Sequence, residues 1–124
     1  MQVLNFSHPL SAEQLTLISE LIEGPISKVT EVKVQLSNDQ AFGPQISALV
    51  DQCGLTPHQW QHTPLLVNLP GLSSAAALII AEIHGRAGYF PDCLRTAPVG
   101  SPPKFEPREI LRLSAVRELA REKR

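Results

Sequence analysis

The chain has 124 residues, enough for one domain with a substantial core but too few for two such domains. Its composition, 43% hydrophobic and 19% charged, is typical of globular proteins and excludes the disordered and fibrous classes. A formal net charge of -1 excludes the basic field on which binding of duplex nucleic acid depends, so any nucleotide ligand must be small and held locally.

The first half of the chain predicts two strands, each followed by a helix. Residues 3–6 form the first strand, and Ser11 with Gln14 makes an approximate capping box that starts a helix ending before Gly24-Pro25. Val29, Val32, Val34 and Leu36, most of them β-branched, predict a second strand over residues 29–36 that ends in the turn residues following it. Helical spacing of apolar residues then predicts a helix over residues 42–53.

The second half begins with residues 56–63, which are interpreted as a connector. A continuous apolar strand at residues 65–67 precedes a helix at 74–84 that is apolar on nearly every side. Runs of this kind belong to elements that are covered on both faces, as in parallel sheets with flanking helices.

The C-terminal part predicts two further strands and a last helix. Residues 89–95 form a fourth strand and residues 97–104, which are rich in proline, form a loop. Residues 110–113 return as a last strand. Ser114 is expected to cap a helix over residues 114–123.

This order, β-α-β-α-β-α-β-β-α, predicts a single α/β domain over residues 1–124. Helices between successive strands favour an open, mostly parallel Rossmann-like sheet flanked by helices. In such sheets, ligands bind beyond the carboxyl ends of the strands, where the strand order switches. A site is therefore expected in the loops that follow the strands.

Two of these loops carry polar groups. Residues 5–9, Asn-Phe-Ser-His-Pro, follow the first strand, and residues 68–73, Asn-Leu-Pro-Gly-Leu-Ser, follow the third. Ser11, and Ser73 or Ser74, are expected to cap the next helices, where free N–H groups favour anions. The candidate ligand-binding residues are Asn5, Phe6, Ser7, His8, Pro9, Ser11, Asn68, Leu69, Pro70, Gly71, Leu72, Ser73 and Ser74.

Each loop also has a purely structural interpretation. Asn and Ser at strand ends commonly form turns by bonding to their own backbone. Phe6 is as readily a core residue as a stacking surface, because side chains alternate between the two faces of a strand. Two such loops at equivalent strand ends shift the balance modestly towards a pocket.

Several familiar sites are missing from the sequence. It contains no GxGxxG and no GxxxxGK[ST], which leaves dinucleotide and triphosphate binding of those types without support. His58 and His62 are four residues apart, but Pro57 and Pro64 bracket them and no further ligands are evident, so neither a metal nor a cofactor is expected. His84 is interpreted as a core or interface histidine. The C-terminal arginines alternate with glutamates, as on a solvated helix face.

Cys53 and Cys93 lie far apart and in no CxxC arrangement, which argues against a disulfide framework and a zinc ribbon. Two buried thiols in a reducing compartment are expected instead. The N-terminus lacks the basic start and sustained apolar core of a signal peptide, and the longest apolar run, residues 74–83, is too short to span a bilayer. We expect a cytoplasmic protein.

Three stretches of the chain resemble a known family. They are MQVLNFSHPLS at the start, PLLVNLPGLSSAAALIIAEIHGRAGYFP in the middle and EILRLSAVRELAR at the end. They look like the small Rossmann-like accessory proteins encoded with type III CRISPR systems, and the resemblance spans nearly the whole chain. It implies a homodimer that binds a cyclic oligoadenylate, chiefly cyclic tetra-adenylate, and so damps the second-messenger signal. Some members are ring nucleases that linearise the messenger, whereas others sequester it.

The implied ligand can be compared with the residues. Cyclic tetra-adenylate has rotational symmetry, so a two-fold dimer with two copies of each loop would match it. The apolar helix at 74–84 is a candidate part of the dimer surface. Phosphates would lie near Ser11 and the Ser73-Ser74 pair. Asn5 or Asn68 would read adenine, with Phe6 stacking if it faces the site.

A metal-independent ring nuclease must align a ribose 2′-hydroxyl with phosphorus, remove its proton and stabilise the developing charge. His8, the one histidine in a candidate loop, is the natural general base or acid, and Ser7 would position the phosphate. Neither loop contains Lys or Arg, which leaves charge stabilisation to N–H groups or to a distant cation such as Arg86, Arg95 or Lys104.

Sequestration of the messenger is therefore the first expectation. Slow cleavage to linear products with a 2′,3′-cyclic phosphate is the alternative. A Rossmann-like protein-interaction module without a nucleotide ligand is the third possibility, in which the two loops are only turns.

Overall fold

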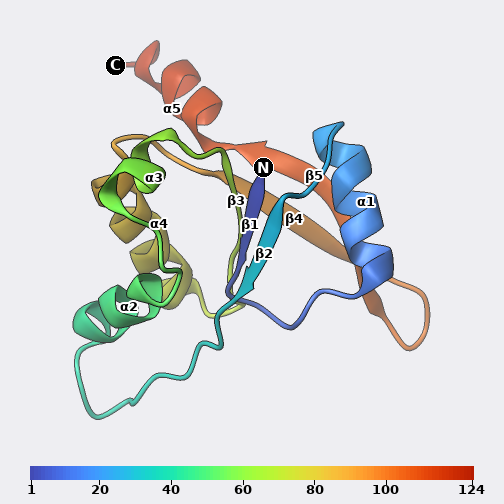
Figure 1. Cartoon of the computed structure of the whole chain (residues 1–124), viewed down its shortest axis with the longest axis horizontal. Helices are drawn as coiled ribbons and strands as arrows, with labels where there is room; N and C mark the ends of the chain where they lie inside the picture. Colours follow the sequence, from blue (N-terminus) through green and yellow to red (C-terminus); the bar gives the residue numbers. More distant parts are fainter.

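A five-stranded, mostly parallel sheet forms the centre of the protein, as seen in the computed structural model, which describes residues 1–124 (Figure 1). The strand order is β2-β1-β3-β4-β5. The strands are β1 (Gln2–Asn5), β2 (Lys28–Glu31), β3 (Leu65–Asn68), β4 (Asp92–Val99) and β5 (Lys104–Arg112). Only β5 runs antiparallel to its neighbour. The single-domain, Rossmann-like α/β architecture predicted from the sequence is confirmed.

Helices cover both faces of this sheet (Figure 1). α1 (Ala12–Ile22) lies on one face, and α2 (Phe42–Asp51), α3 (Pro57–His62) and α4 (Ser73–Ala87) lie together on the other. α5 (Leu113–Arg121) extends from the end of β5 and buries none of its residues. It has the solvated face predicted for the C-terminal arginines.

The two faces of the sheet have separate cores, because side chains alternate along each strand. Leu4, Val67 and Cys93 belong to the larger cluster, which packs beneath α2, α3 and α4. Val3 and Leu66 point the other way and pack against α1. All four residues of β3 are buried, as its continuous apolar run predicts.

The second strand is shorter than its sequence pattern predicts. β2 ends at Glu31, and residues 32–37 belong to no helix or strand. The pattern is correct for burial, since Val32 is buried and Val34 and Leu36 pack against the larger core. A strand needs a hydrogen-bonded neighbour, however, and β1 already ends at Asn5.

The predicted connector at residues 56–63 contains a helix instead. Thr56 and Gln59 form a complete capping box, and Pro57 occupies the first turn of α3. The helix buries Trp60 in the larger core. This single anchor residue accounts for the helix, which is too short to show a periodic apolar pattern.

The C-terminal region differs most from expectation. The predicted loop at 97–104 is the tip of a β-hairpin, because β4 continues to Val99 and β5 begins at Lys104. The fourth strand was predicted to start at Tyr89 but starts at Asp92. The last strand, predicted over residues 110–113, spans Lys104–Arg112 and is therefore much longer. The last helix begins one residue early, and Ser114 does not cap it: its hydroxyl donates to the carbonyl of Phe90.

Helix α4 packs within its own chain rather than presenting a broad apolar surface. Ala75, Ile79 and Ile83 are buried, and Leu78 and Ile80 pack against the same core. The expected dimer surface at 74–84 is thus largely used inside the fold, which leaves mainly small side chains exposed. The residues of α4 that remain exposed are Ser73, Ser74, Ala77, Ala81 and Gly85.

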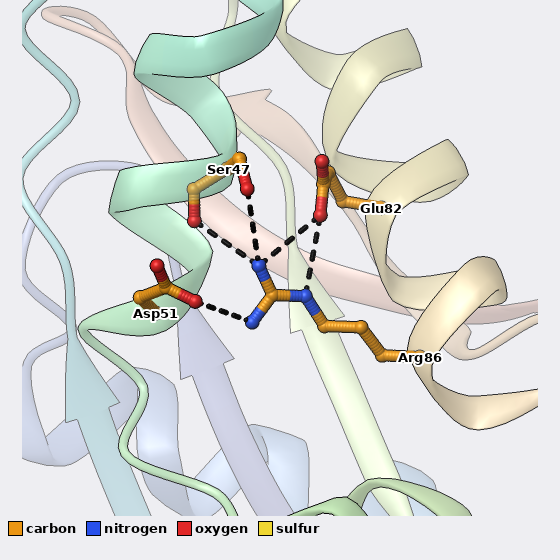
Figure 2. A network of polar contacts seen from close by, with 4 residues as sticks. All are labelled: Ser47, Asp51, Glu82 and Arg86. Atoms are coloured by element: carbon orange, nitrogen blue, oxygen red, sulfur yellow. Dashed lines mark hydrogen bonds and ion pairs between the residues drawn. The ribbon is translucent and has the colours of Figure 1, made fainter.

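An arginine fastens α4 to α2 (Figure 2). The Arg86 guanidinium donates to Asp51 at 2.7 Å, to Glu82 at 3.2 Å, and to both the carbonyl and the hydroxyl of Ser47. It also lies 5.8 Å from the centre of the Trp60 ring on α3. Partial burial lowers its pKa, but these bonds and charges outweigh burial and leave the pKa above its ordinary value. Arg86 therefore joins three helices on one face of the sheet.

Candidate functional site

A row of polar side chains crosses three neighbouring strands where each ends. In the parallel register, Asn5 of β1 lies beside Glu31 of β2 on one side and Asn68 of β3 on the other. The Asn68 amide donates to Oδ1 of Asn5 at 2.9 Å, and the Asn5 amide donates to Glu31 at 2.6 Å. The carboxyl edge predicted from the sequence is thus held together by side chains as well as by the sheet.

Asn5 has no hydrogen-bonding capacity left for a ligand. Besides the bonds to Asn68 and Glu31, its Oδ1 accepts from the backbone N–H of Ser7 at 3.0 Å, and its Nδ2 donates to the carbonyl of His8 at 2.8 Å. The residue is fully buried. The expectation that Asn5 reads adenine therefore conflicts with this arrangement, and the structural interpretation of Asn5 as a turn residue holds.

A cavity of about 730 Å³ lies at this carboxyl edge. Both predicted loops line it, through Phe6, Ser7, His8 and Pro9 from the first loop and Pro70, Gly71 and Leu72 from the second. A third segment also lines it, the stretch after β2 together with the start of α2. Both predicted loops thus line one cavity, whose third wall lies outside the residues predicted from the sequence.

Several predicted ligand-binding residues do not line this cavity. Ser11 caps α1, accepting from the N–H of Gln14, and Asn68 is turned towards Asn5. Leu69 packs against the core. Ser73 and Ser74 are exposed, but neither caps α4, whose N-cap residue is Leu72. Phe6 lines the cavity with very little of its surface, since it is 1% exposed, so the core interpretation of its ring holds.

The wall that the sequence analysis missed contains the cation that the other two lack. Lys33 is exposed and lines the cavity, beside Glu31 and the apolar Val34 and Leu36. The distant cations considered from the sequence lie elsewhere: Arg86 is bound between α2 and α4, and the other two, Arg95 and Lys104, are on the β4–β5 hairpin. The sequence pattern hid Lys33, because the strand predicted over residues 29–36 places it inside the strand and not in a loop after its end.

Two helices begin at this cavity without side-chain caps. Phe42, the first residue of α2, lines it, as does Leu72, the N-cap residue of α4, and neither helix has a side-chain capping bond. By contrast, α1 and α3 both start with complete capping boxes. Uncapped helix N-termini present N–H donors and a positive dipole end, which favour an anion.

The remaining histidines and the cysteines lie outside the cavity. His58 and His62 stack on each other with ring centres 4.1 Å apart, and no group of three or more potential metal ligands occurs anywhere in the chain. His84 packs against Phe90. Cys53 and Cys93 are free and buried, as predicted, and burial raises the pKa of their thiols to about 11 and about 12. None of the helices has the length and apolar character needed to cross a membrane.

Comparisons with known proteins add no relatives: no family model, curated protein or solved structure matches this chain.

Proposed function

We propose that this protein binds a cyclic oligoadenylate, most simply cyclic tetra-adenylate, at the carboxyl-edge cavity. By sequestering it, the protein would lower the second-messenger signal of a type III CRISPR system, acting in the cytoplasm. The observation that carries the proposal is the convergence of both family-like loops on one cavity with Lys33 and two uncapped helix N-termini.

The cavity offers chemistry for phosphate on one side and for bases on the other. Free N–H groups at the start of α2 and α4, together with the Lys33 ammonium, suit phosphate oxygens. Val34, Leu36, Phe42 and Leu72 supply apolar surface for a base, and half of Leu72 is exposed. This pairing of donors with apolar walls is what a nucleotide ligand requires.

The size of the cavity supports a shared ligand. A volume of about 730 Å³ falls within the roughly 300–1,000 Å³ of pockets that enclose one drug-sized molecule. A ring of four nucleotides is larger than that, so one chain would hold only part of it. A second chain related by two-fold symmetry would then hold the equivalent part.

Ring-nuclease activity is the second candidate, and one observation favours it. His8 is exposed and lines the same cavity as Lys33, so a general base or acid and a cation face one bound ligand. Ser7 lies in the same wall, held by the turn at Asn5. Sequestration remains first, because a single cation gives modest stabilisation of the developing charge.

The experiment is incubation of the purified protein with cyclic tetra-adenylate, with linear tetra-adenylate as the matched control. The melting temperature reports binding, and chromatography over several hours reports the fate of the ligand. Stabilisation with intact ring is expected for sequestration, whereas stabilisation followed by linear product would identify a ring nuclease. A melting temperature unchanged by saturating cyclic ligand would reject both and favour an interaction module.

A further inference from the structure

The stretch that follows β2 shows the alternating burial of a strand, with Lys33 and Gln35 exposed and Val34 and Leu36 partly buried, but it has no backbone partners within the chain. None of the N–H or C=O groups of Lys33, Val34, Gln35 and Leu36 forms a hydrogen bond within the chain. Unpaired backbone groups in an extended segment at the edge of a sheet are a template for pairing with another strand. This segment, residues 33–36, is called the free edge below.

The alternating burial indicates that the free edge continues the geometry of the strand that leads into it. Val32 donates its N–H to the carbonyl of Asn5 at 2.8 Å, so its backbone groups point inward, towards β1. Successive residues of a strand direct these groups to opposite sides, so Lys33 and Gln35 point theirs outward. The side chains alternate as well, with Val34 and Leu36 packed on the core and Lys33 and Gln35 exposed.

We propose that the free edge pairs with the free edge of a second copy of this chain, antiparallel, about a two-fold axis at Val34. Lys33 of each copy then lies opposite Gln35 of the other, and each such pair exchanges two backbone hydrogen bonds. The two Val34 side chains meet at the axis, and Val32 lies opposite Leu36, so apolar residues share one face.

Two features of the chain select this register over its neighbours. A pair centred on Lys33 would set the two ammonium groups directly opposite each other, which is destabilising. A pair centred on Gln35 would need the outward groups of Ser37, but Gln45 already occupies both. The Ser37 N–H donates to Gln45 at 2.7 Å, and Gln45 donates to the Ser37 carbonyl at 3.0 Å. Of these three registers, the one centred on Val34 avoids both obstacles.

The opposite edge of the sheet lacks this capacity. β5 contains Pro107, which has no N–H to donate, and the register of its ladder with β4 shifts between Arg95 and Thr96. Prolines and irregular ladders are common protection for exposed edges. The free edge contains neither, so self-association is directed to one side of the molecule.

This pairing deepens the proposed function. Its role in ligand binding rests on that function, whereas the pairing itself does not. Lys33, Val34 and Leu36 line the cavity and also belong to the free edge, so pairing brings two cavities to either side of the axis. A ring ligand too large for one cavity could then contact both chains. The interface itself is small, so we expect weak association of the free protein that the ligand strengthens.

Cysteine substitution tests the register without any ligand. In a non-hydrogen-bonded antiparallel pair, the two α carbons are about 4.5 Å apart, within the range that a disulfide bridges. Val34→Cys is therefore expected to form covalent dimers under mild oxidation. Lys33→Cys and Gln35→Cys are matched controls, because each would lie diagonally from its own copy at about 7–8 Å, too far for ready bridging. The native thiols are buried and do not compete.

The outcomes of this test are distinct. A rate of covalent dimer formation at least tenfold higher for Val34→Cys than for either control would support the pairing. Equal rates for all three, or preference for either control, would overturn it. If Val34→Cys folds poorly, analytical sedimentation can compare the dimerisation of the wild type with that of Gln35→Pro. Gln35→Pro removes an outward N–H and should weaken dimerisation. The control variant, Gln35→Thr, keeps this N–H and should dimerise like the wild type. A wild type that stays monomeric at millimolar concentration would also overturn the proposal, while leaving ligand binding by one chain to be judged separately.

Discussion

The Asn68 amide donates to Oδ1 of Asn5 across two parallel strands, and this bond is the centre of the carboxyl edge. Through it, the ends of β1 and β3 are joined, and Asn5 extends the connection to Glu31 at the end of β2. The loop that contains Ser7 and His8 takes its shape from the same side chain. Asn5 is therefore a positioning residue for the cavity wall.

Asn5→Ala is expected to lower the free energy of unfolding by about 2–4 kcal/mol, since it leaves several buried polar groups without partners. Urea denaturation measures this change. Glu31→Gln is the control, because it keeps a side-chain oxygen as acceptor and should cost less than about 1 kcal/mol. A cost for Asn5→Ala no greater than that of the control would show that the polar row contributes little.

Lys33→Ala is expected to weaken binding of cyclic tetra-adenylate about tenfold or more, because a charge-assisted phosphate contact is lost. Isothermal titration at several salt concentrations measures this, and the salt dependence should fall as well. Lys28→Ala is the matched control, since Lys28 is exposed on the same strand region but lies outside the cavity. Equal losses for both variants would mean that only overall charge matters.

His8→Ala separates sequestration from cleavage. If wild type forms linear product, this variant is expected to lower the rate by roughly 10²–10⁴-fold while leaving affinity within a few-fold, as loss of a general base or acid does. Single-turnover chromatography measures the rate. His62→Ala is the control because His62 is exposed and does not line the cavity. Product formation that survives in His8→Ala would exclude His8 as the catalytic residue.

Arg86→Lys is expected to destabilise the fold by about 1–3 kcal/mol, because lysine cannot reach Asp51, Glu82 and Ser47 together. Thermal and urea unfolding measure the loss. Arg95→Lys is the matched control: Arg95 makes an exposed pair with Glu109, and such pairs contribute less than about 1 kcal/mol. Similar costs for the two variants would argue against Arg86 as a connection between helices.

The buried thiols predict how stability responds to alkaline pH. Burial raises the pKa of Cys53 from 9.0 to about 11 and that of Cys93 from 9.0 to about 12. Above pH 9 the unfolded chain loses these protons while the folded chain keeps them, so the free energy of unfolding should fall as pH rises from about 9 to 12. Cys53→Ala should make the decline shallower, in urea denaturation at each pH. If the free energy of unfolding of Cys53→Ala declines with pH as steeply as that of the wild type, the decline comes from groups other than Cys53.

The sequence predicted those parts of the fold that depend on local chemistry. The capping box of Ser11 and Gln14 is present, and the continuous apolar run at β3 is fully buried between two layers. The capping box at Thr56 was equally available in the sequence, but α3 is short and Trp60 alone anchors it. Periodicity could not reveal a helix with one buried residue.

Other features depend on which segments lie side by side, which a single sequence does not contain. Val34 and Leu36 have the alternating burial of a strand, yet no other strand forms backbone hydrogen bonds with them within the chain. Likewise, prolines at 97–104 suggest a loop, whereas pairing with β5 keeps β4 extended as far as Val99. The same lack of neighbour information hid Lys33, because its wall of the cavity begins where β2 stops.

The uncapped starts of α2 and α4 have a consequence for how local motion can be observed. The first N–H groups of α4 have no acceptor in the protein, so they should exchange with deuterium quickly, by fraying of the first turn rather than by global opening. An anion that accepts from them would slow this exchange at residues 73–75 while leaving the capped start of α1 unchanged. Amide exchange at one helix end would thereby report occupancy of the cavity, residue by residue, even for a ligand that alters no other part of the structure.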